Sequence, residues 1–132
     1  EAWLKGMTPR GFRLLMRRTG VLDQARVSDA DLDAHLDLLR RGDGGRAFLQ
    51  IMRGFERTPE KRELYARALG GPYPVQVVWG AEDPFLRVGE HGEHARKAAG
   101  LPRIHTVPAR HFLQEDQAPA VAAHIRDIAR GA

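Results

Sequence analysis

Two residues with complementary acid–base chemistry stand in the second half of the sequence. Asp83 lies in Trp-Gly-Ala-Glu-Asp-Pro (79–84), and His111 lies in Ala-Arg-His-Phe-Leu-Gln-Glu-Asp (109–116). A carboxylate can hold an imidazole in one tautomer and stabilise the imidazolium that forms when the ring takes up a proton. Such a pair is the acid and base of a nucleophile–histidine–acid triad. The alternatives are Glu82 as the acid, or a purely turn-capping role for Asp83.

The acid and the histidine must be brought together by the elements around them. Residues 75–79, Val-Gln-Val-Val-Trp, are mostly β-branched or aromatic and predict a buried strand that ends just before the acid. Residues 103–107 predict a second strand, and residues 90–99 predict the helix between the two. Because adjacent parallel strands lie about 4.8 Å apart, the loops after their carboxyl ends meet at one edge of the sheet. A last helix over residues 118–130 completes a β-α-β-α unit.

The first 70 residues predict four amphipathic helices. Helix-capping residues stand at the expected starts, at Thr8, Ser28, Asp43 and Thr58. Apolar residues follow each cap at helical spacing, and we expect those of the fourth helix to face inward, because short amphipathic helices need an apolar surface to lie on. The apolar residues are Phe12, Leu15 and Met16, then Leu32, Leu36 and Leu39, then Phe48, Ile51, Met52 and Phe55, and finally Leu64, Tyr65, Ala68 and Leu69.

The fold class predicted from these elements is α/β and mostly helical. Residues 1–71 form a helical segment, and residues 72–132 form the β-α-β-α segment with two parallel strands, with Pro72-Tyr73-Pro74 at the boundary. Two parallel strands leave open edges, which is typical of the end of a larger sheet. The chain also begins with Glu1 and not with Met, so we expect a segment of a longer protein.

The amino-acid composition argues against several classes of function. The 132 residues include no cysteine, which excludes disulfides, thiolate nucleophiles and zinc–thiolate sites and fits a cytoplasmic protein. The sequence contains no apolar run long enough for a membrane span or a secretory leader. The net charge is +4, but basic residues alternate with acids and lack interleaved aromatic side chains, which speaks against nucleic-acid binding. The alternative is a nucleic-acid binder that uses the arginines of residues 10–17.

The two motifs together resemble a known family. Val-Val-Trp-Gly-Ala-Glu-Asp-Pro (77–84) and His-Phe-Leu-Gln-Glu-Asp (111–116) resemble the carboxyl-terminal part of α/β-hydrolase-fold proteins, in the branch of haloalkane dehalogenases and epoxide hydrolases. The resemblance implies that Asp83 is the triad acid and His111 the catalytic base. It further implies hydrolysis of an ester, halide or epoxide bond in a small-molecule substrate, through a covalent intermediate and without cofactor or metal.

The same resemblance assigns the helical segment to the lid, or cap, of the family. Lid residues Phe48, Met52 and Phe55 then line the substrate pocket, or alternatively form only the core of the lid. The residue before the family's histidine is commonly glycine, whereas this chain has Arg110, which is strained if the position requires positive φ. We therefore expect the orientation of His111 to depend on Arg110.

The nucleophile of the family is absent from the sequence. The family places it in a Gly-x-Ser-x-Gly elbow or its aspartate equivalent, whereas Ser28 is the only serine here and stands at a helix cap. We therefore expect the chain to be inactive alone and to need a missing N-terminal segment. The alternative is a non-catalytic interaction module that self-associates into a homo-oligomer, without nucleic-acid or membrane partners.

Two further patterns are given structural interpretations. His91 and His94 lie three residues apart with Glu90 and Glu93 nearby, which could hold a metal, but an exposed polar helix surface is favoured. The glycines of residues 42–45 follow a predicted helix and lack the Lys-Ser/Thr ending of a phosphate-binding loop, which indicates a linker. No metal site is therefore predicted.

Overall fold

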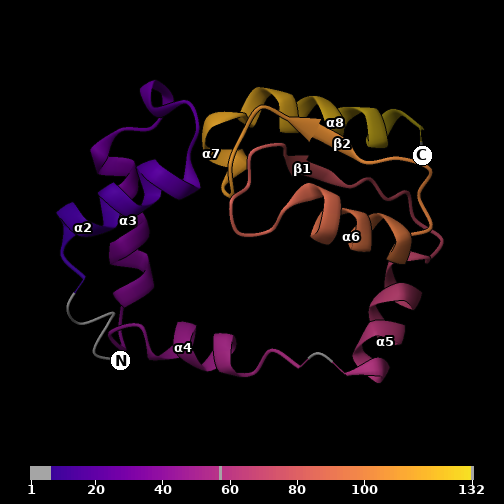
Figure 1. Cartoon of the computed structure of the whole chain (residues 1–132), viewed down its shortest axis with the longest axis horizontal. Coiled ribbons are helices and arrows are strands. Elements are labelled where there is room, and N and C mark those ends of the chain that lie inside the picture. The colour runs from indigo at the N-terminus through magenta and orange to yellow at the C-terminus, as the bar shows by residue number, and fades with distance from the viewer. Residues whose placement is uncertain (1–6, 57, 132) are drawn as a thin grey trace.

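The first half of the chain is helical. The computed structural model describes residues 7–56 and 58–131, and Figure 1 shows how their helices and strands are arranged. Before the first strand, the regular elements are α2 (Pro9–Leu15), the π-helical turn η1 (Met16–Gly20), the 3-10 turn η2 (Gln24–Arg26), α3 (Asp29–Arg40), α4 (Arg46–Arg53) and α5 (Pro59–Leu69). The four predicted helices are therefore confirmed, with the first ending in a wider π-helical turn.

The second half alternates strand and helix. Its elements are β1 (Val78–Gly80), the π-helical turn η3 (Val88–Gly92), α6 (Glu93–Ala98), β2 (His105–Val107), α7 (Leu113–Asp116) and α8 (Ala118–Gly131). The strands pair in parallel, with Val78 opposite His105 and Gly80 opposite Val107. The mostly helical, mixed α/β class is thus confirmed. Both strands are shorter than predicted, because their ladder spans three residues on each strand, and α7 is an element that the sequence pattern does not predict.

Helices cover both faces of the sheet. Gly92, in η3, lies against Trp79 and Ile104 on one face, so closely that an added Cβ would stand 2.8 Å from the Ile104 side chain. The ring of His105 faces the opposite side, because side chains alternate along a strand, and it contacts the ring of His124 on α8. α6 and α8 accordingly lie on opposite sides of the two strands, as Figure 1 shows. This arrangement gives a parallel sheet the two covered faces that it needs.

Local capping explains where the first-half helices begin. Thr8 and Thr58 each accept a hydrogen bond from a backbone N–H of the first turn, and both precede a proline. Ser28 forms a reciprocal capping box with Asp31. The Asp43 carboxylate accepts hydrogen bonds from three successive backbone N–H groups at the start of α4. All four predicted caps are confirmed.

The buried core lies between α2 and α3. Its residues are Phe12, Met16, Val21, Val27, Leu32 and Leu36, with Met7, Leu39 and Phe112 packed against it. Ion pairs cross its solvent side: Arg13 contacts Asp29 and Asp33, and Arg17 contacts Asp29 at 2.6 Å. Because Phe112 follows His111 directly, this core reaches the loop that carries the predicted catalytic base.

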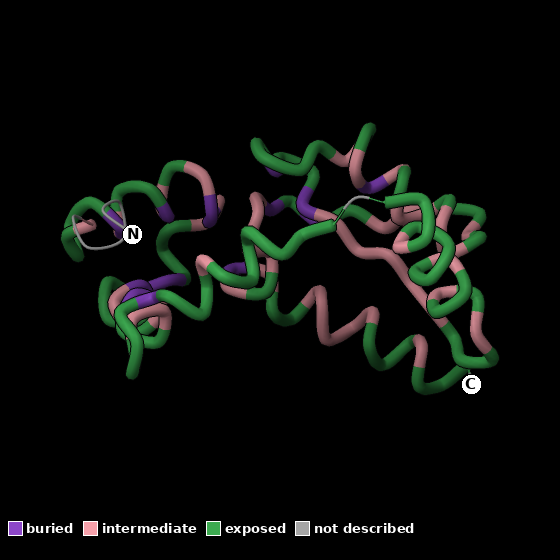
Figure 2. Tube along the Cα trace, turned by 90° about the horizontal axis from the view of Figure 1, so that it is seen from below, coloured by how far each residue is buried: buried purple, intermediate pink, exposed green. Residues whose placement is uncertain are grey.

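The helices α4 and α5 have no comparable core. Neither contains a buried residue, and Figure 2 shows this part of the chain as almost entirely exposed. The expectation that Leu64 and Tyr65 face inward is wrong, since they are 47% and 56% exposed. The physical reason is that an amphipathic stripe is buried only where a second apolar surface covers it, and α6, which contacts α5, leaves these side chains largely uncovered.

The predicted boundary between residues 1–71 and 72–132 falls in the connection from α5 to β1. Residues 1–6, 57 and 132 of these two segments lie outside the described residues. Within the described ranges, no helix combines the length and the hydropathy that crossing a bilayer requires.

Candidate functional site

Asp83 lies in a tight loop that follows the carboxyl end of β1. Its side chain is 5% exposed, and Oδ1 accepts hydrogen bonds from the backbone N–H groups of Phe85 and Leu86, each 2.9 Å long. The indole Nε1 of Trp79 donates to the Leu86 carbonyl oxygen at 2.7 Å, which fixes the far end of the loop. Glu82, the alternative acid, is exposed. The loop therefore holds the Asp83 carboxylate in one orientation.

The other carboxylate oxygen of Asp83 contacts the ring of His111. Asp83 Oδ2 lies 2.8 Å from His111 Nδ1, which is a hydrogen-bond distance. Burial raises the pKa of the Asp83 carboxyl, but the hydrogen bonds from Leu86, His111 and Phe85 together lower this pKa by more, so it lies below its ordinary value. Asp83 is thus an anion at neutral pH, and Nδ1 of the ring donates to it. This leaves the lone pair of a neutral His111 on Nε2, the atom that accepts a proton in general-base catalysis.

Aromatic side chains hold the His111 ring on two sides. The rings of Phe85 and Phe112 meet it edge-on, with centroid distances of 5.5 Å and 4.9 Å. Within the described ranges, no hydrogen bond involves Nε2. The dyad borders a hollow of about 160 Å³, which is lined by Val78, Trp79, Gly80, Asp83, Leu86, His111 and Leu113. This volume is below the roughly 300–1,000 Å³ of ordinary ligand pockets, so a substrate needs further walls.

Arg110 ties the histidine loop to the first half of the chain. Its guanidinium Nη1 donates to the carbonyl oxygens of Arg17 and Val21, at 3.0 and 3.2 Å. The backbone N–H of Phe112 donates to the Gly20 carbonyl oxygen at 2.9 Å. Arg110 is not among the residues with positive φ, which in the described chain are all glycines. The expected strain at this position is therefore absent, and Arg110 anchors the loop instead.

Asp116 provides a second anchor that the sequence analysis missed. Asp116 is 1% exposed, and its Oδ2 accepts hydrogen bonds from the backbone N–H groups of Leu22 and Asp23, at 2.7 and 2.8 Å. The contact joins residues more than ninety positions apart, so no local pattern could reveal it. The only signal was an acid at the end of the His-Phe-Leu-Gln-Glu-Asp motif, at residues 111–116.

The acid loop and the histidine loop are in direct contact at Gly80. A Cβ at this position would lie 2.2 Å from the Arg110 carbonyl oxygen and 2.7 Å from that of Ala109. The backbone N–H of Glu82 also donates to the Ala109 carbonyl oxygen at 3.0 Å. Only glycine therefore allows the approach that brings the Asp83 carboxylate to the imidazole ring.

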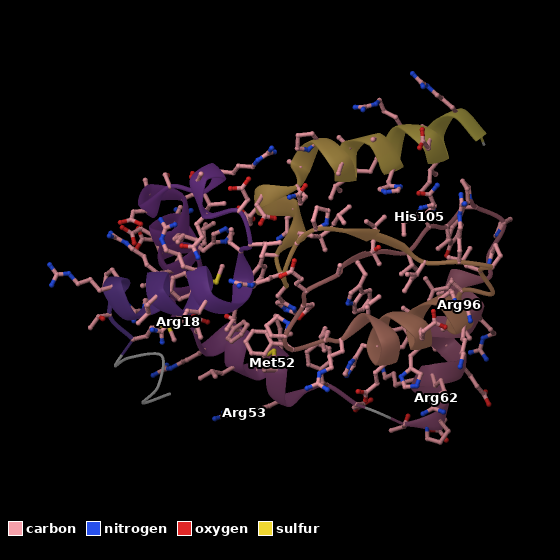
Figure 3. All side chains as sticks on the ribbon, turned by 45° about the horizontal axis from the view of Figure 1, so that its top comes forward. Arg18, Met52, Arg53, Arg62, Arg96 and His105 are labelled. Carbon is pink, nitrogen blue, oxygen red and sulfur yellow. The ribbon has the colours of Figure 1, made fainter. Side chains whose placement is uncertain are left out.

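The predicted substrate-lining residues lie apart from the hollow at the dyad. Phe48 and Met52 lie on α4, and Phe55 follows it; they are 37%, 50% and 66% exposed, and none lines that hollow. Figure 3 shows Met52 and Arg53 leaving α4 in different directions. The apolar side chains of α4 are not buried by any other part of the described chain.

The remaining histidines are not gathered into one cluster in the described chain. The described residues contain no group of three or more His, Cys, Asp or Glu side chains placed to hold a metal ion. His94 is exposed, whereas Nδ1 of His91 is buried without a hydrogen-bond partner in the described chain. His35 pairs with Glu115 at 3.3 Å. The structure thus brings no carboxylate cluster to these histidines.

Two of the three arginines on the face of the first helix, which are Arg10, Arg13 and Arg17, form intramolecular ion pairs. Both Arg13 and Arg17 contact carboxylates of α3, and Arg17 also donates to the carbonyl oxygens of Gln24 and Val27. The hydrogen bonds that the Arg13 guanidinium donates to Asp33 raise the pKa of Arg13 above its ordinary value, and Asp29 adds to the effect. These charges are directed at carboxylates of the same chain, which weakens the case for phosphate binding there.

Comparison of the chain with protein-family models, curated proteins and solved structures finds no match. The functional interpretation therefore depends on the geometry of Asp83 and His111 and on the motifs that carry them.

Proposed function

We propose that this chain carries the acid and the base of a hydrolytic site, within the carboxyl-terminal part of an α/β-hydrolase-type fold. The observation that carries the proposal is the 2.8 Å contact between Asp83 Oδ2 and His111 Nδ1. Both residues follow the carboxyl ends of adjacent parallel strands, which is where open α/β sheets place their ligands. The motif resemblance to haloalkane dehalogenases and epoxide hydrolases supports the same function.

In the proposed reaction, His111 acts as general base. Its Nε2 removes a proton from a hydroxyl nucleophile, or from the water that hydrolyses an ester intermediate. The Asp83 carboxylate stabilises the imidazolium that results and holds Nδ1 protonated throughout. The substrate is a small molecule with an ester, carbon–halogen or epoxide bond. The reaction as proposed uses no cofactor and takes place in the cytoplasm.

The nucleophile in this proposal comes from outside the described residues. Ser28 Oγ donates to Asp31 Oδ2 at 2.6 Å and accepts from the Asp31 backbone N–H at 3.2 Å, so the only serine of the chain is a helix cap. Within the described chain each strand has a single neighbour, which leaves one open edge on β1 and one on β2. A nucleophile-bearing segment that pairs with such an edge also supplies the missing walls of the site, while Phe48, Met52 and Phe55 belong to the proposed lid.

The tautomer of His111 tests the dyad directly. Long-range ¹H–¹⁵N NMR distinguishes protonated Nδ1 from protonated Nε2, and we expect His111 to carry its neutral-state proton on Nδ1. Asp83→Asn removes the charge, so we expect it to shift this tautomer toward Nε2. The matched control is Asp37→Asn, since Asp37 is an exposed aspartate on α3. A ring that carries its proton on Nε2 in the unmodified chain contradicts the proposal.

A second experiment tests hydrolysis. Intact-mass spectrometry of the natively purified sample shows whether a second polypeptide accompanies the chain. Where one does, we expect turnover of p-nitrophenyl esters, and a loss on the order of 10⁶-fold in His111→Ala. Where only the chain is present, we expect no turnover beyond that of free imidazole. Wild-type turnover in both Asp83→Asn and His111→Ala would overturn the assignment.

A second candidate function is a self-associating interaction module. The exposed apolar side chains of α4, Ile51 at 64% and Met52 at 50%, favour it, as do the open strand edges. If the chain has this function, we expect sedimentation equilibrium to show a dimer or larger species, and we expect Ile51→Asp to dissociate it. A compact monomer at every concentration rules this function out.

A further inference from the structure

A groove separates α5 from α6, at the other end of the sheet from the Asp83–His111 dyad. Its volume is about 750 Å³, within the usual range for a small-molecule site, and it shares no lining residue with the hollow at the dyad. α6 runs from the carboxyl end of β1 back toward the start of β2, so its last turn lies near the amino ends of the strands (Figure 1). The groove is therefore a separate feature of the molecule.

The floor of the groove is apolar and comes from both helices. Tyr65, Ala66 and Leu69 contribute from α5, and Ala95 and Ala98 contribute from α6. The alanine side chains are too small to fill the space between the two helices. Such a surface suits an aliphatic chain, since its burial releases water from both partners.

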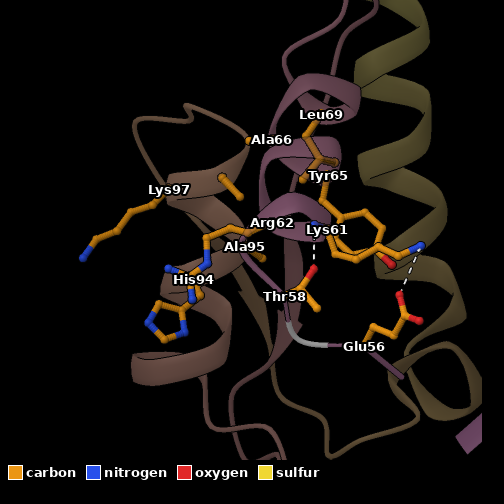
Figure 4. Close-up of a pocket in the computed structure, with 11 residues that line it drawn as sticks. Glu56, Thr58, Lys61, Arg62, Tyr65, Ala66, Leu69, His94, Ala95 and Lys97 are labelled. Carbon is orange, nitrogen blue, oxygen red and sulfur yellow. Dashed lines mark hydrogen bonds and ion pairs between the residues drawn. The ribbon is translucent and has the colours of Figure 1, made fainter. Parts of the chain in front are cut away.

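Basic residues border this apolar floor. Arg62 and Lys61 come from α5 and Lys97 from α6, which also contributes the imidazole of His94. Figure 4 shows Arg62 and His94 toward one side of the groove and Lys61 beside Tyr65 on the other. Lys61 pairs at 3.8 Å with Glu56, and among the described residues that line the groove Glu56 is the only acid.

The cations beside α6 have no such partner. Within the described ranges, no carboxylate forms an ion pair with Arg62 or Lys97, whereas Glu93, the acid at the start of α6, is held by Arg96 at 2.9 Å. One side of the groove thus combines unpaired positive charge with an adjacent apolar floor. A neutral lipid would not form an ion pair with these cations, and inorganic phosphate would not cover the apolar floor.

We propose that this groove binds a carboxylate with a medium-length aliphatic tail. The guanidinium of Arg62 receives the carboxylate through charge-assisted hydrogen bonds, with Lys97 adding to the positive field. The tail lies over the alanines and Leu69. The site is independent of the Asp83–His111 dyad, and it binds its ligand whether or not the dyad is part of a hydrolase.

Octanoate and octan-1-ol are the matched probes, because they share a chain length and differ in charge. In a ¹H–¹⁵N NMR titration of the full chain we expect octanoate to shift the amides of Ala66, Ala95 and Ala98, with a dissociation constant on the order of 1 mM. Octan-1-ol is expected to bind about tenfold more weakly, and so is acetate, which lacks the tail. Equal binding of octanoate and octan-1-ol overturns the proposal, as does a shift confined to α4.

Substitutions test separately how the charge of Arg62 and the apolar floor of the groove contribute to binding. Arg62→Gln is expected to weaken octanoate binding about tenfold and to leave octan-1-ol unchanged. The matched control is Arg67→Gln, on the same helix, because Arg67 pairs with Glu63 at 3.9 Å and does not line the groove. Both arginines are exposed, so neither change removes a core contact. Ala98→Phe fills the floor and should block both probes. Equal octanoate affinity in Arg62→Gln and Arg67→Gln contradicts the proposal.

Discussion

The pairs α2–α3 and α4–α5 have similar amphipathic sequence patterns and different structural outcomes. In the first pair, apolar stripes meet each other and bury Leu32 and Leu36 almost completely. In the second pair, the stripes meet nothing comparable in the described chain, and Ile51 remains 64% exposed. Both pairs begin at well-formed caps, so the difference arises after helix formation. Local signals determine where a helix starts, whereas burial depends on which surface the rest of the chain brings to it.

The pair with a core is also the pair that positions the dyad. Carbonyl oxygens in residues 17–21 accept hydrogen bonds from Arg110 and Phe112, and the backbone N–H groups of residues 22 and 23 donate to Asp116. These three partners flank His111 on both sides. The α4–α5 pair makes no such contacts with this loop. Support for the histidine loop therefore comes from η1 and the residues that follow it, in the connection between α2 and α3.

Matched core and surface substitutions give the largest expected contrast. We expect Leu32→Ala to lower the free energy of unfolding by about 2–5 kcal/mol, because it leaves a cavity in a packed core. Ile51→Ala on α4 should change it by less than about 0.5 kcal/mol, because the side chain is exposed and alanine favours helix. Urea denaturation followed by circular dichroism measures both. Similar losses in the two variants would show that the α4 stripe is buried in solution.

The sequence was sufficient to predict the helices, their caps and the parallel strand pair. Thr8, Ser28 and Thr58 act locally, and their hydrogen bonds lie within three residues of the cap. The inward direction predicted for Leu64 and Tyr65 failed because periodicity identifies an apolar face without identifying what covers it. α7 was missed because a helix of four residues is too short to show a period.

The dyad was predictable because strand topology converts sequence order into proximity. Asp83 and His111 each follow a β-rich segment, and a parallel pair brings the two following loops to the same edge. The anchors of the loop were not predictable, because Arg110 and Asp116 contact residues about ninety positions away. Arg110 was expected to be a source of strain, whereas its φ is ordinary and its guanidinium anchors the loop.

Removal of the Asp116 anchor should have an intermediate effect. Asp116→Ala leaves the buried N–H groups of Leu22 and Asp23 without their acceptor, so we expect a loss of about 1–3 kcal/mol in the free energy of unfolding. The ring resonances of His111 should shift as well, because the loop loses its connection to the α2–α3 pair. The control is Asp37→Ala, an exposed acid on α3, with an expected change within about 0.5 kcal/mol. Unchanged His111 resonances in a destabilised Asp116→Ala would show that the α2–α3 pair does not position the ring.

The smallest expected effect is a pH dependence at the His105–His124 contact, on the face of the sheet opposite α6. The centroids of the two rings lie 4.6 Å apart. Burial lowers the pKa of His105 below its ordinary value, and the charges of His124 and Arg103 lower it further. Asp127 acts in the opposite direction. An unfolded histidine takes up its proton near pH 6.5, whereas folded His105 does so only at lower pH. The unfolded state therefore binds more protons in this window, and stability falls as the pH drops below about 6.5.

Denaturation midpoints between pH 8 and pH 5 test this dependence. We expect the midpoint of the unmodified chain to be steady above about pH 6.5 and to fall below it, and His105→Gln to reduce that fall. His94→Gln serves as the control, because His94 is exposed and lies on α6, on the opposite side of the sheet from α8. The lowered pKa of Asp83 does not interfere, because its contribution is present above about pH 3.9 and is lost only as the pH falls further. If His105→Gln and the unmodified chain lose stability equally from pH 8 to pH 5, the histidine contact does not couple the packing of α8 to protonation.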